Sequence, residues 1–242
     1  MSTGPRIYCT DPLTVDARVE LDSQAATHLL RVLRMNPGDA LRLFNGDGRE
    51  YAATLCEAGK KNASATVTSV LRQDAPPALS LHLGQVISKG DRMDFTIQKA
   101  TELGISEITP LWSERCEVRL KGERLEKKTD HWQKVAISAC EQSGRNHLPL
   151  IHAPQTLSEW CRNTDADVKC ILHPHNQKPL KDYPAPHSLA LLVGPEGGFS
   201  ENEVQQVLSA GFHGLTLGPR ILRTETAALA ALSVFQYQWG DF

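Results

Sequence analysis

The stretch that decides the fold reads Leu189-Ala190-Leu191-Leu192-Val193-Gly194-Pro195-Glu196-Gly197-Gly198-Phe199-Ser200. It consists of an apolar strand, a glycine-rich turn and the start of a helix. Ser200 and Glu203 form a capping box, which predicts a helix over residues 201–210. A strand that ends in glycine lets backbone groups approach a ligand without a side chain in the way. The turn is therefore a candidate for a binding site built largely from main chain.

A second turn of the same kind follows the short apolar strand predicted over residues 215–217. It precedes an alanine-rich helix and reads Gly218-Pro219-Arg220-Ile221-Leu222-Arg223-Thr224-Glu225-Thr226. Two such turns after neighbouring parallel strands form one crevice at the carboxyl edge of a sheet, where open α/β folds bind ligands. Neither turn matches a common nucleotide fingerprint, because G-x-G-x-x-G and G-x-x-x-x-G-K-[ST] are both missing. Either turn alone could be an ordinary strand-to-helix link, but the pair favours a ligand site.

From Leu79 onward, apolar strands alternate with helices. The predicted strands cover residues 79–87, 106–111, 148–153, 168–172, 189–193 and 215–217, and the predicted helices cover residues 91–103, 123–143, 156–163, 201–210 and 225–238. This alternation predicts an α/β fold with a parallel sheet covered on both faces. Connection rules alone predict an unknotted, doubly wound sheet.

The first part of the chain is rich in β-strands instead. Residues 40–44 and 63–70 alternate with period two, and Asn45-Gly46-Asp47-Gly48 is a hairpin signal. One helix, near residues 23–34, interrupts the strands. Short strands at this spacing predict a small β-barrel over residues 1–72, followed by a stiff, proline-containing linker at 73–77 and a second domain over 78–242.

Composition is that of an ordinary globular protein, with a net charge of −2 over 242 residues. Residues 1–74 carry nine Lys and Arg against nine Asp and Glu, so this segment is neutral. Any contact with RNA must therefore come from local clusters of cations rather than from a basic total.

Several classes of protein are disfavoured by the sequence. No apolar run approaches the length that crosses a bilayer, and no apolar signal core follows the N-terminus. The six cysteines show no C-x-x-C spacing, which predicts reduced thiols in a cytoplasmic protein. No zinc pattern is present, and His173 and His175 have no third ligand nearby in sequence, so we expect no metal.

Both glycine-rich motifs closely resemble those of the ribosomal RNA small subunit methyltransferase E family. Three further segments are similar to that family: Gln98-Lys99-Ala100-Thr101-Glu102-Leu103-Gly104, Ala139-Cys140-Glu141-Gln142-Ser143-Gly144-Arg145, and the stretch from His28 through Asp39. One position departs from the pattern, because His175 stands where the resemblance leads us to expect an acidic residue. The resemblance extends over the whole chain.

The resemblance implies a fold, an activity and partners. The fold is a C-terminal SPOUT-type methyltransferase domain with a trefoil knot, preceded by a small PUA-like β-barrel that binds RNA. The activity is methylation of N3 of a uridine in 16S rRNA with S-adenosylmethionine as cofactor. The substrate is 16S rRNA in an assembled or nearly assembled small ribosomal subunit, and the enzyme is a cytoplasmic homodimer without a membrane or a metal as partner.

Backbone groups of three loops are suited to hold the adenosine part of such a cofactor. The candidate cofactor-binding residues are Leu172, His173, Gly194, Pro195, Glu196, Gly197, Gly198, Leu217, Gly218, Arg220, Ile221 and Leu222.

Methyl transfer from a sulfonium is an in-line displacement, so much of the catalysis can come from positioning. The N3 proton must leave, and the resulting negative charge on the base needs stabilising, which arginine does well because it stays cationic and presents a planar fork of donors. The candidate catalytic residues are Arg220, Arg223, Glu225, Glu141 and Arg145. We favour Glu225 or Glu141 as a group that orients an arginine, because a carboxylate beside arginines has a lowered pKa and is a poor base.

The candidate RNA-binding residues are His28, Arg31, Arg34 and Lys99. The first three recur on one predicted helix whose buried side is supplied by Leu29, Leu30, Val32 and Leu33. Lys99 and Glu102 could also be a simple surface pair, and the run 115–128, with a surplus of three positive charges, could be solvated surface. Two other functions remain open at this point: a non-catalytic RNA-binding protein, and a phosphate-handling α/β enzyme that uses the first turn as an anion site.

Overall fold

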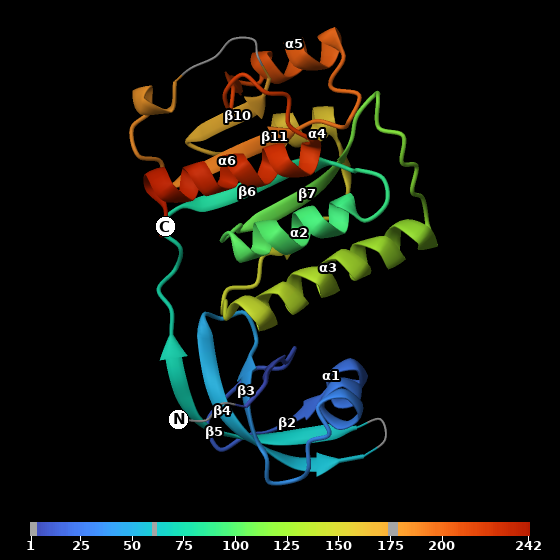
Figure 1. Ribbon diagram of the computed structural model, residues 1–242, viewed down its shortest axis with the longest axis vertical. Helices are drawn as coiled ribbons and strands as arrows, with labels where there is room; N and C mark the ends of the chain where they lie inside the picture. Colours follow the sequence, from blue (N-terminus) through green and yellow to red (C-terminus); the bar gives the residue numbers. More distant parts are fainter. Residues whose placement is uncertain (1–3, 60–61, 174–178) are drawn as a thin grey trace. The chain divides into compact units, whose positions relative to one another are not determined.

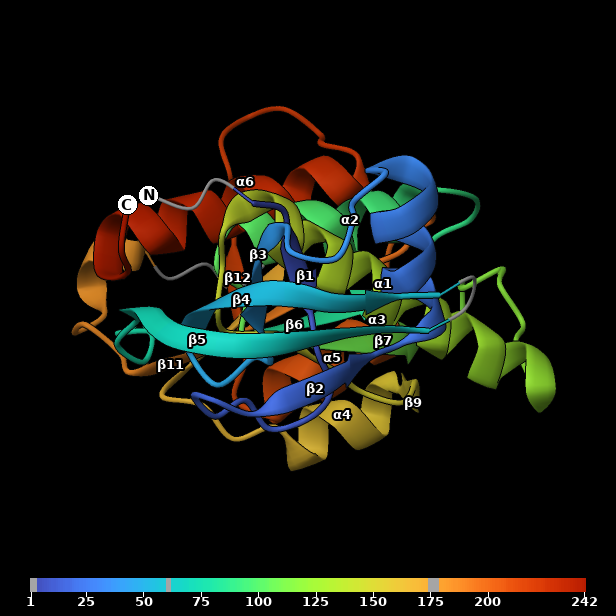
Figure 2. The ribbon, with the colours of Figure 1, turned by 90° about the horizontal axis from the view of Figure 1, so that it is seen from below.

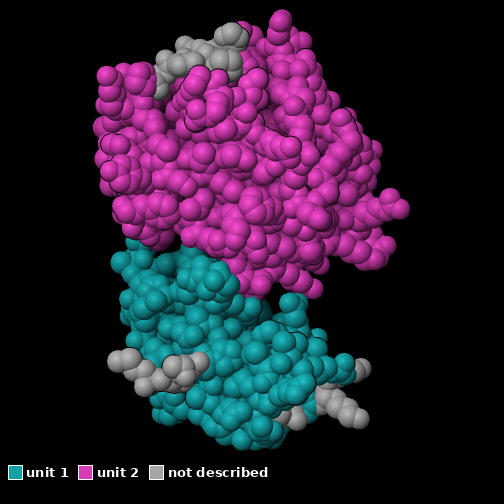
Figure 3. Space-filling model, in the orientation of Figure 1, with its two compact units in different colours: residues 1–76, 140–148 teal, residues 77–139, 149–242 magenta. Residues whose placement is uncertain are grey.

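The computed structural model of the chain describes residues 4–59, 62–173 and 179–242. It divides into two compact units (Figure 3). The N-terminal unit comprises residues 1–76 and 140–148, and the C-terminal unit comprises residues 77–139 and 149–242. The chain first passes between them at Pro76–Pro77, inside the stretch predicted as a linker. The segment 140–148, which the sequence placed in the second domain, lies in the N-terminal unit.

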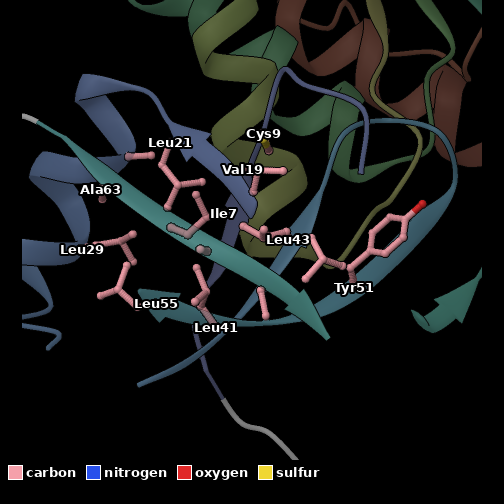
Figure 4. Packing of buried hydrophobic residues seen from close by; sticks show 14 of the residues in the cluster. Ile7, Cys9, Val19, Leu21, Leu29, Leu41, Leu43, Tyr51, Leu55 and Ala63 are labelled. Carbon is pink, nitrogen blue, oxygen red and sulfur yellow. The ribbon is translucent and has the colours of Figure 1, made fainter. Parts of the chain in front are cut away.

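The N-terminal unit is built on one five-stranded sheet with the order β1-β3-β4-β5-β2. Its elements are β1 (Arg6–Tyr8), β2 (Arg18–Leu21), α1 (Ser23–Thr27), a π-helix (His28–Val32), β3 (Ala40–Phe44), β4 (Arg49–Ala58) and β5 (Ala63–Gln73). Leu43 pairs with Tyr51 across the turn at 45–48, which confirms the predicted hairpin. The strands surround a cluster of buried side chains that includes Ile7, Leu41 and Leu55 (Figure 4).

The helix predicted over residues 23–34 is interrupted. An α-helix ends at Thr27 and a π-helix follows, in which the amide of Leu33 donates to the carbonyl of His28 over 3.0 Å. This wider turn breaks the expected three-residue spacing. The predicted apolar side is therefore wrong in part, because Leu29 is buried while Val32 and Leu33 are 65% and 41% exposed. Arg34 follows with a left-handed backbone, at φ 56°.

A buried arginine holds the segment 140–148 in the N-terminal unit. Arg6 is 8% exposed, and its Nε donates to Glu50 Oε1 over 2.7 Å. The two other nitrogens of its guanidinium reach the carbonyl of Cys140 and Oδ1 of Asn146, each at 2.5 Å, and the guanidinium carbon lies 4.4 Å from the ring centre of Phe44. A buried charge is tolerated only when its partners satisfy it, so this network explains why 140–148 packs with β1.

The C-terminal unit contains a parallel sheet with the order β12-β10-β11-β6-β7-β8, and β9 also pairs with β7. Its strands are β6 (Ser80–Val86), β7 (Glu107–Trp112), β8 (Leu150–Ile151), β9 (Gln155–Thr156), β10 (Val168–Leu172), β11 (Ser188–Val193) and β12 (His213–Leu215). Its helices are α2 (Arg92–Glu102), α3 (Glu123–Ser143, which continues into the N-terminal unit), α4 (Leu157–Asn163), a short 3₁₀ turn (Leu180–Asp182), α5 (Glu201–Ser209) and α6 (Thr224–Trp239). In Figures 1 and 2, α2 and α6 lie side by side on one face of the sheet, and α4 and α5 cover the other. None of the described helices is both long and apolar enough to span a membrane.

The predicted strand over 215–217 lies two residues too late. Residues 213–215 pair with residues 170–172 of β10, and the chain then leaves the sheet. Thr216 and Leu217 therefore belong to the turn rather than to the strand.

We expect that Arg6→Met lowers the free energy of unfolding of the N-terminal unit by about 3 kcal/mol, because Glu50 and the carbonyl of Cys140 lose a buried partner. Hydrogen exchange of the amides in β1 and β3 against denaturant measures this. The matched control is Arg18→Met, since Arg18 pairs with Glu57 at 2.7 Å with both side chains largely exposed, and we expect a change below about 1 kcal/mol. Equal effects of the two variants would contradict the role given to Arg6.

Candidate active site

The two glycine-rich turns lie at the carboxyl edge of the parallel sheet. The first follows β11 and the second follows β12, and β10 lies between these strands. The sequence suggested that the strands carrying the turns are direct neighbours. They are not, because β10 lies between them. Leu172, at the end of β10, and His173 directly after it also line the site.

Two adjoining pockets open at this edge. The first, of about 430 Å³, is called here the apolar pocket and is lined by Leu172, His173, Leu215, Thr216, Leu217, Gly218, Pro219, Arg220, Ile221, Leu222 and Ala227. The second, of about 630 Å³, is called the arginine pocket and is lined by Arg92, Leu172, His173, Val193, Gly194, Pro195, Glu196, Gly198, Phe199, Ile221, Leu222, Arg223, Thr224 and Ala227. Both have the size of small-molecule sites, and they share part of their walls.

The structure brings the predicted cofactor-binding residues together. Of the twelve, all except Gly197 line one pocket or both. The carbonyl of Gly197 instead accepts a hydrogen bond of 2.9 Å from Nη1 of Arg115. The predicted departure at His175 lies outside the described residues.

A buried threonine joins the first turn to the start of α6. The hydroxyl of Thr224 donates to the carbonyl of Gly194 over 2.7 Å and accepts from Nε2 of Gln85 over 3.0 Å. Gln85 belongs to β6, which pairs directly with β11. Because Thr224 is only 7% exposed and Gln85 is fully buried, these hydrogen bonds fix the two turns relative to one another.

The two key glycines are required for different reasons. A Cβ on Gly194 would lie 2.9 Å from the ring of Phe199, so only glycine lets that ring approach the turn. A Cβ on Gly218 would meet nothing within 4 Å, but φ there is +79°, which L side chains rarely adopt.

Charged side chains hold the first turn from outside. Nη1 of Arg92, at the start of α2, lies 2.5 Å from Oε1 of Glu196, and both side chains are about two-fifths exposed. Glu203 is 4% exposed, and its carboxylate accepts from the amides of Ser200 and Glu114, at 2.9 and 2.7 Å. The loop after β7 therefore supports the turn, together with the capping box predicted from sequence.

The predicted catalytic residues are divided between the two units. Arg220 lines the apolar pocket and Arg223 lines the arginine pocket, and both are exposed. Within the described part of the chain, Glu225 forms no ion pair with either arginine, and its buried Oε2 has no hydrogen-bond partner. The predicted orientation of an arginine by Glu225 is thus not seen in this structure.

Glu141 and Arg145 belong to the N-terminal unit. The carboxylate of Glu141 accepts from the amide of Tyr8 over 3.0 Å, and the carbonyl of Arg145 accepts from Arg6. Burial raises the pKa of Glu141, whereas the sequence argument expected a lowered one, because removal from water outweighs the nearby positive charge. Both residues have structural contacts here, and their catalytic roles stay predictions.

The candidate RNA-binding residues are accessible, but several cations are engaged within the protein. His28, Arg31 and Arg34 are exposed. Lys99 forms an ion pair with Glu102 at 2.7 Å, which is the alternative to RNA binding that the sequence left open. In the positive run, Arg115 holds Gly197, Lys127 pairs with Glu123, and Lys128 pairs with Asp94 at 2.9 Å. Of these contacts, the one between Lys128 and Asp94 balances a positive charge of the run with a carboxylate from outside it.

A polar cluster that the sequence analysis missed lies toward the opposite ends of the strands. His82, Glu107 and His152 bring three potential metal-ligand atoms within 4.8 Å of one another. Nε2 of His152 lies 2.6 Å from Glu107, and Nε2 of His82 accepts from Trp160 Nε1 over 3.2 Å. Burial lowers the pKa of His82 to about 4, so the ring is neutral and suited to accept that bond. We interpret the cluster as a hydrogen-bonded network between β6, β7 and α4.

We predict that Thr224→Val lowers the free energy of unfolding by about 1–3 kcal/mol, because the carbonyl of Gly194 loses the hydroxyl donor and the Gln85 amide loses one of its two acceptors. It should also weaken binding of S-adenosylmethionine, measured by calorimetry, because the turns are no longer held together. Thr224→Ser, which keeps the hydroxyl, and Thr226→Val, at an exposed position on the same helix, serve as controls. Wild-type stability and affinity in Thr224→Val would contradict the assignment.

Two protein-family models match the chain. The family model for an RNA methyltransferase domain matches residues 75–236, and that for an RNA methyltransferase PUA domain matches residues 21–68. Ribosomal RNA small subunit methyltransferase E of Buchnera aphidicola is 38% identical over 240 residues, which covers 98% of this chain and 95% of that protein.

Two solved structures resemble the whole chain. A methyltransferase from Legionella pneumophila in complex with the cofactor S-adenosylmethionine is 44% identical, with a TM-score of 0.94 and 99% coverage of both chains. Ribosomal RNA small subunit methyltransferase E from Neisseria gonorrhoeae, bound to the same molecule, is 41% identical, with a TM-score of 0.90 and the same coverage. The chain therefore belongs to the ribosomal RNA small subunit methyltransferase E family, with a PUA domain followed by an RNA methyltransferase domain.

Proposed function

We propose that this protein methylates N3 of a uridine in 16S rRNA, with S-adenosylmethionine as the methyl donor. The observation that carries the proposal is the pair of adjoining pockets between the two glycine-rich turns, one apolar and one lined by arginines. A transferase of this kind needs two neighbouring sites, one for the donor and one for the acceptor. Family membership and the ligand in two similar structures support the choice of donor.

The apolar pocket is suited to hold the cofactor. Its walls are the ends of β10 and β12 and the turn 216–222, with Leu172, Leu217 and Leu222 offering apolar contacts to an adenine ring. Gly218, which lines this pocket, leaves the backbone of the second turn accessible, and this fits a ligand held by main-chain groups. When bound, S-adenosylmethionine supplies an electrophilic methyl group.

The chain's own contribution is positioning and charge. Loss of the N3 proton leaves a negative charge shared with the two uracil oxygens, and we assign its stabilisation to Arg223, with Arg220 close by on the same turn. The buried, unpartnered oxygen of Glu225 lies at the start of α6 directly after these arginines, which supports a role near the site. Glu141 and Arg145 are left out of this assignment, because their contacts lie in the N-terminal unit.

The N-terminal domain, over residues 1–72, is proposed to bind RNA. The support is the match to a PUA domain and the exposed His28, Arg31 and Arg34 on and after the π-helix. We further propose that the substrate is rRNA within an assembled or nearly assembled small subunit, that the protein acts in the cytoplasm, and that the C-terminal domain has the trefoil knot of SPOUT enzymes. Lys99 is a further candidate contact to RNA.

A purified-component assay tests the function. The protein is incubated with S-adenosylmethionine and small ribosomal subunits that lack the modification, and the rRNA nucleosides are identified by mass spectrometry. We expect 3-methyluridine at a single position. Methylation at another atom would overturn the N3 assignment, and RNA binding without binding of S-adenosylmethionine would favour a non-catalytic RNA-binding protein. Stabilisation by ATP but not by S-adenosylmethionine would favour a phosphate-handling enzyme.

Arg223→Ala should lower the rate at saturating cofactor and RNA by roughly 10²–10³, because one preorganised donor to the developing charge is lost. The rate of the variant should recover as the pH rises toward the pKa of the uridine, since deprotonation then no longer needs the missing charge. Single-turnover rates over a pH series measure both effects. Normal turnover with only a raised KM for RNA would move Arg223 from catalysis to binding.

We propose a homodimer formed through α2 and α6. These helices pack against each other and leave large side chains exposed: Phe95 at 46%, Val234 at 39% and Tyr237 at 78%. Sedimentation at micromolar concentration should give about twice the chain mass of 26.7 kDa, and Tyr237→Glu should shift it toward the monomer. A wild-type monomer that is fully active would exclude this interface.

A further inference from the structure

The arginine pocket is lined in part by first-turn residues that we predict to bind the cofactor, but it also contains side chains that a ligand held by main-chain groups does not require. It brings together the guanidinium of Arg92 from α2, that of Arg223 from the second turn, the carboxylate of Glu196 and the ring of Phe199. We propose that this pocket receives the uracil base, with Arg92 and Phe199 as substrate-binding residues that the sequence analysis did not identify. The inference rests on the proposed function and assigns its acceptor site.

The position of the pocket fits an acceptor. It shares Leu172, His173, Ile221, Leu222 and Ala227 with the apolar pocket, so the two pockets adjoin and ligands in them would lie next to each other. Displacement at a methyl group requires the reacting atoms to be in contact and aligned. Its volume, about 630 Å³, also leaves room for a base that has turned out of an RNA strand.

Phe199 supplies a flat surface in a fixed place. Its ring lies against Gly194, where a Cβ would come within 2.9 Å of it, and the side chain is only half-buried. The ring thus packs on the turn and remains partly accessible from the pocket. Single-stranded RNA bases are commonly held by stacking on such rings.

Arg92 can change partner at little cost. Its ion pair with Glu196 spans 2.5 Å, but both side chains are about two-fifths exposed, and ion pairs of that kind contribute little to stability. Glu196 therefore keeps Arg92 at the rim of the pocket without fixing it there. A uracil oxygen that gains negative charge is a suitable new partner, because guanidinium remains cationic and donates in a planar fork.

The test uses Phe199→Leu, Arg92→Ala and Arg92→Lys in the full-length protein. Phe199→Leu should raise the KM for rRNA about tenfold to a hundredfold through lost stacking. Arg92→Ala should lower the maximal rate by roughly 10²–10³, and Arg92→Lys should recover part of it because the charge is kept. For all three, the affinity for S-adenosylmethionine in calorimetry should remain within about twofold of wild type. Melting curves identify any variant that fails to fold. If Arg92→Ala does not fold, the kinetic constants of Arg92→Lys are used for the test instead.

The matched control is Arg162→Ala, which removes an exposed arginine from α4 whose Nε donates to the carbonyl of Ser158 and which lines neither pocket. It should leave both kinetic constants unchanged. Uridine monophosphate, titrated in the presence of S-adenosylhomocysteine, provides a direct probe, and binding should shift the ring resonances of Phe199.

Three results would overturn the assignment. These are a parallel loss of cofactor affinity in the Arg92 and Phe199 variants, which would give the pocket to the cofactor, unchanged kinetic constants in both, or no shift of Phe199 on titration. Failure of the proposed function looks different, because the wild-type protein would then not methylate rRNA at all.

Discussion

The hydroxyl of Thr224 is the contact on which the site depends. It donates to the carbonyl that ends β11 and accepts from a buried amide on β6, while its own backbone begins α6. The Gln85 amide is fully buried and the Gly194 carbonyl is partly buried, so loss of the hydroxyl has a cost in stability. The hydroxyl therefore sets the placement of the two turns together with the pairing of β10 with β11 and β12.

The sheet and helices of the C-terminal unit were largely predictable. Strands buried on both faces are continuous apolar runs, and their helices have clear signals such as the capping box at Ser200, so β10 and α3 were predicted within a residue at each end. The errors have physical causes. The strand predicted over residues 215–217 lies too late, because pairing with β10 ends at Leu215 although a further leucine follows at position 217. The π-helix at His28–Val32 was missed because it has no periodic signal of its own.

The parts of the site that backbone turns form could be predicted from the sequence, whereas the side chains that enter it from other elements could not. Glycines at strand ends are visible in a sequence, so nearly all the predicted cofactor-binding residues line a pocket. Arg92 and Phe199 gave weaker signals, because Arg92 enters the pocket only through the pairing of β6 with β11 and Phe199 only through its contact with Gly194. For the same reason the sequence did not predict the surroundings of Glu141, whose neighbours belong to the N-terminal unit.

The single helix α3 has a consequence for modularity. It starts in one compact unit and ends in the other, where its last turn provides the carbonyl of Cys140 and the residues after it provide the amide oxygen of Asn146, both acceptors for Arg6. A truncation after Pro76 would remove those groups while leaving Arg6 and Glu50 in the core. The N-terminal unit is therefore not an independently transferable module. It is completed by residues 140–148, which follow most of the C-terminal unit's first elements in the chain, so a gene fusion or deletion at residues 76–77 would separate the unit from part of its own interior.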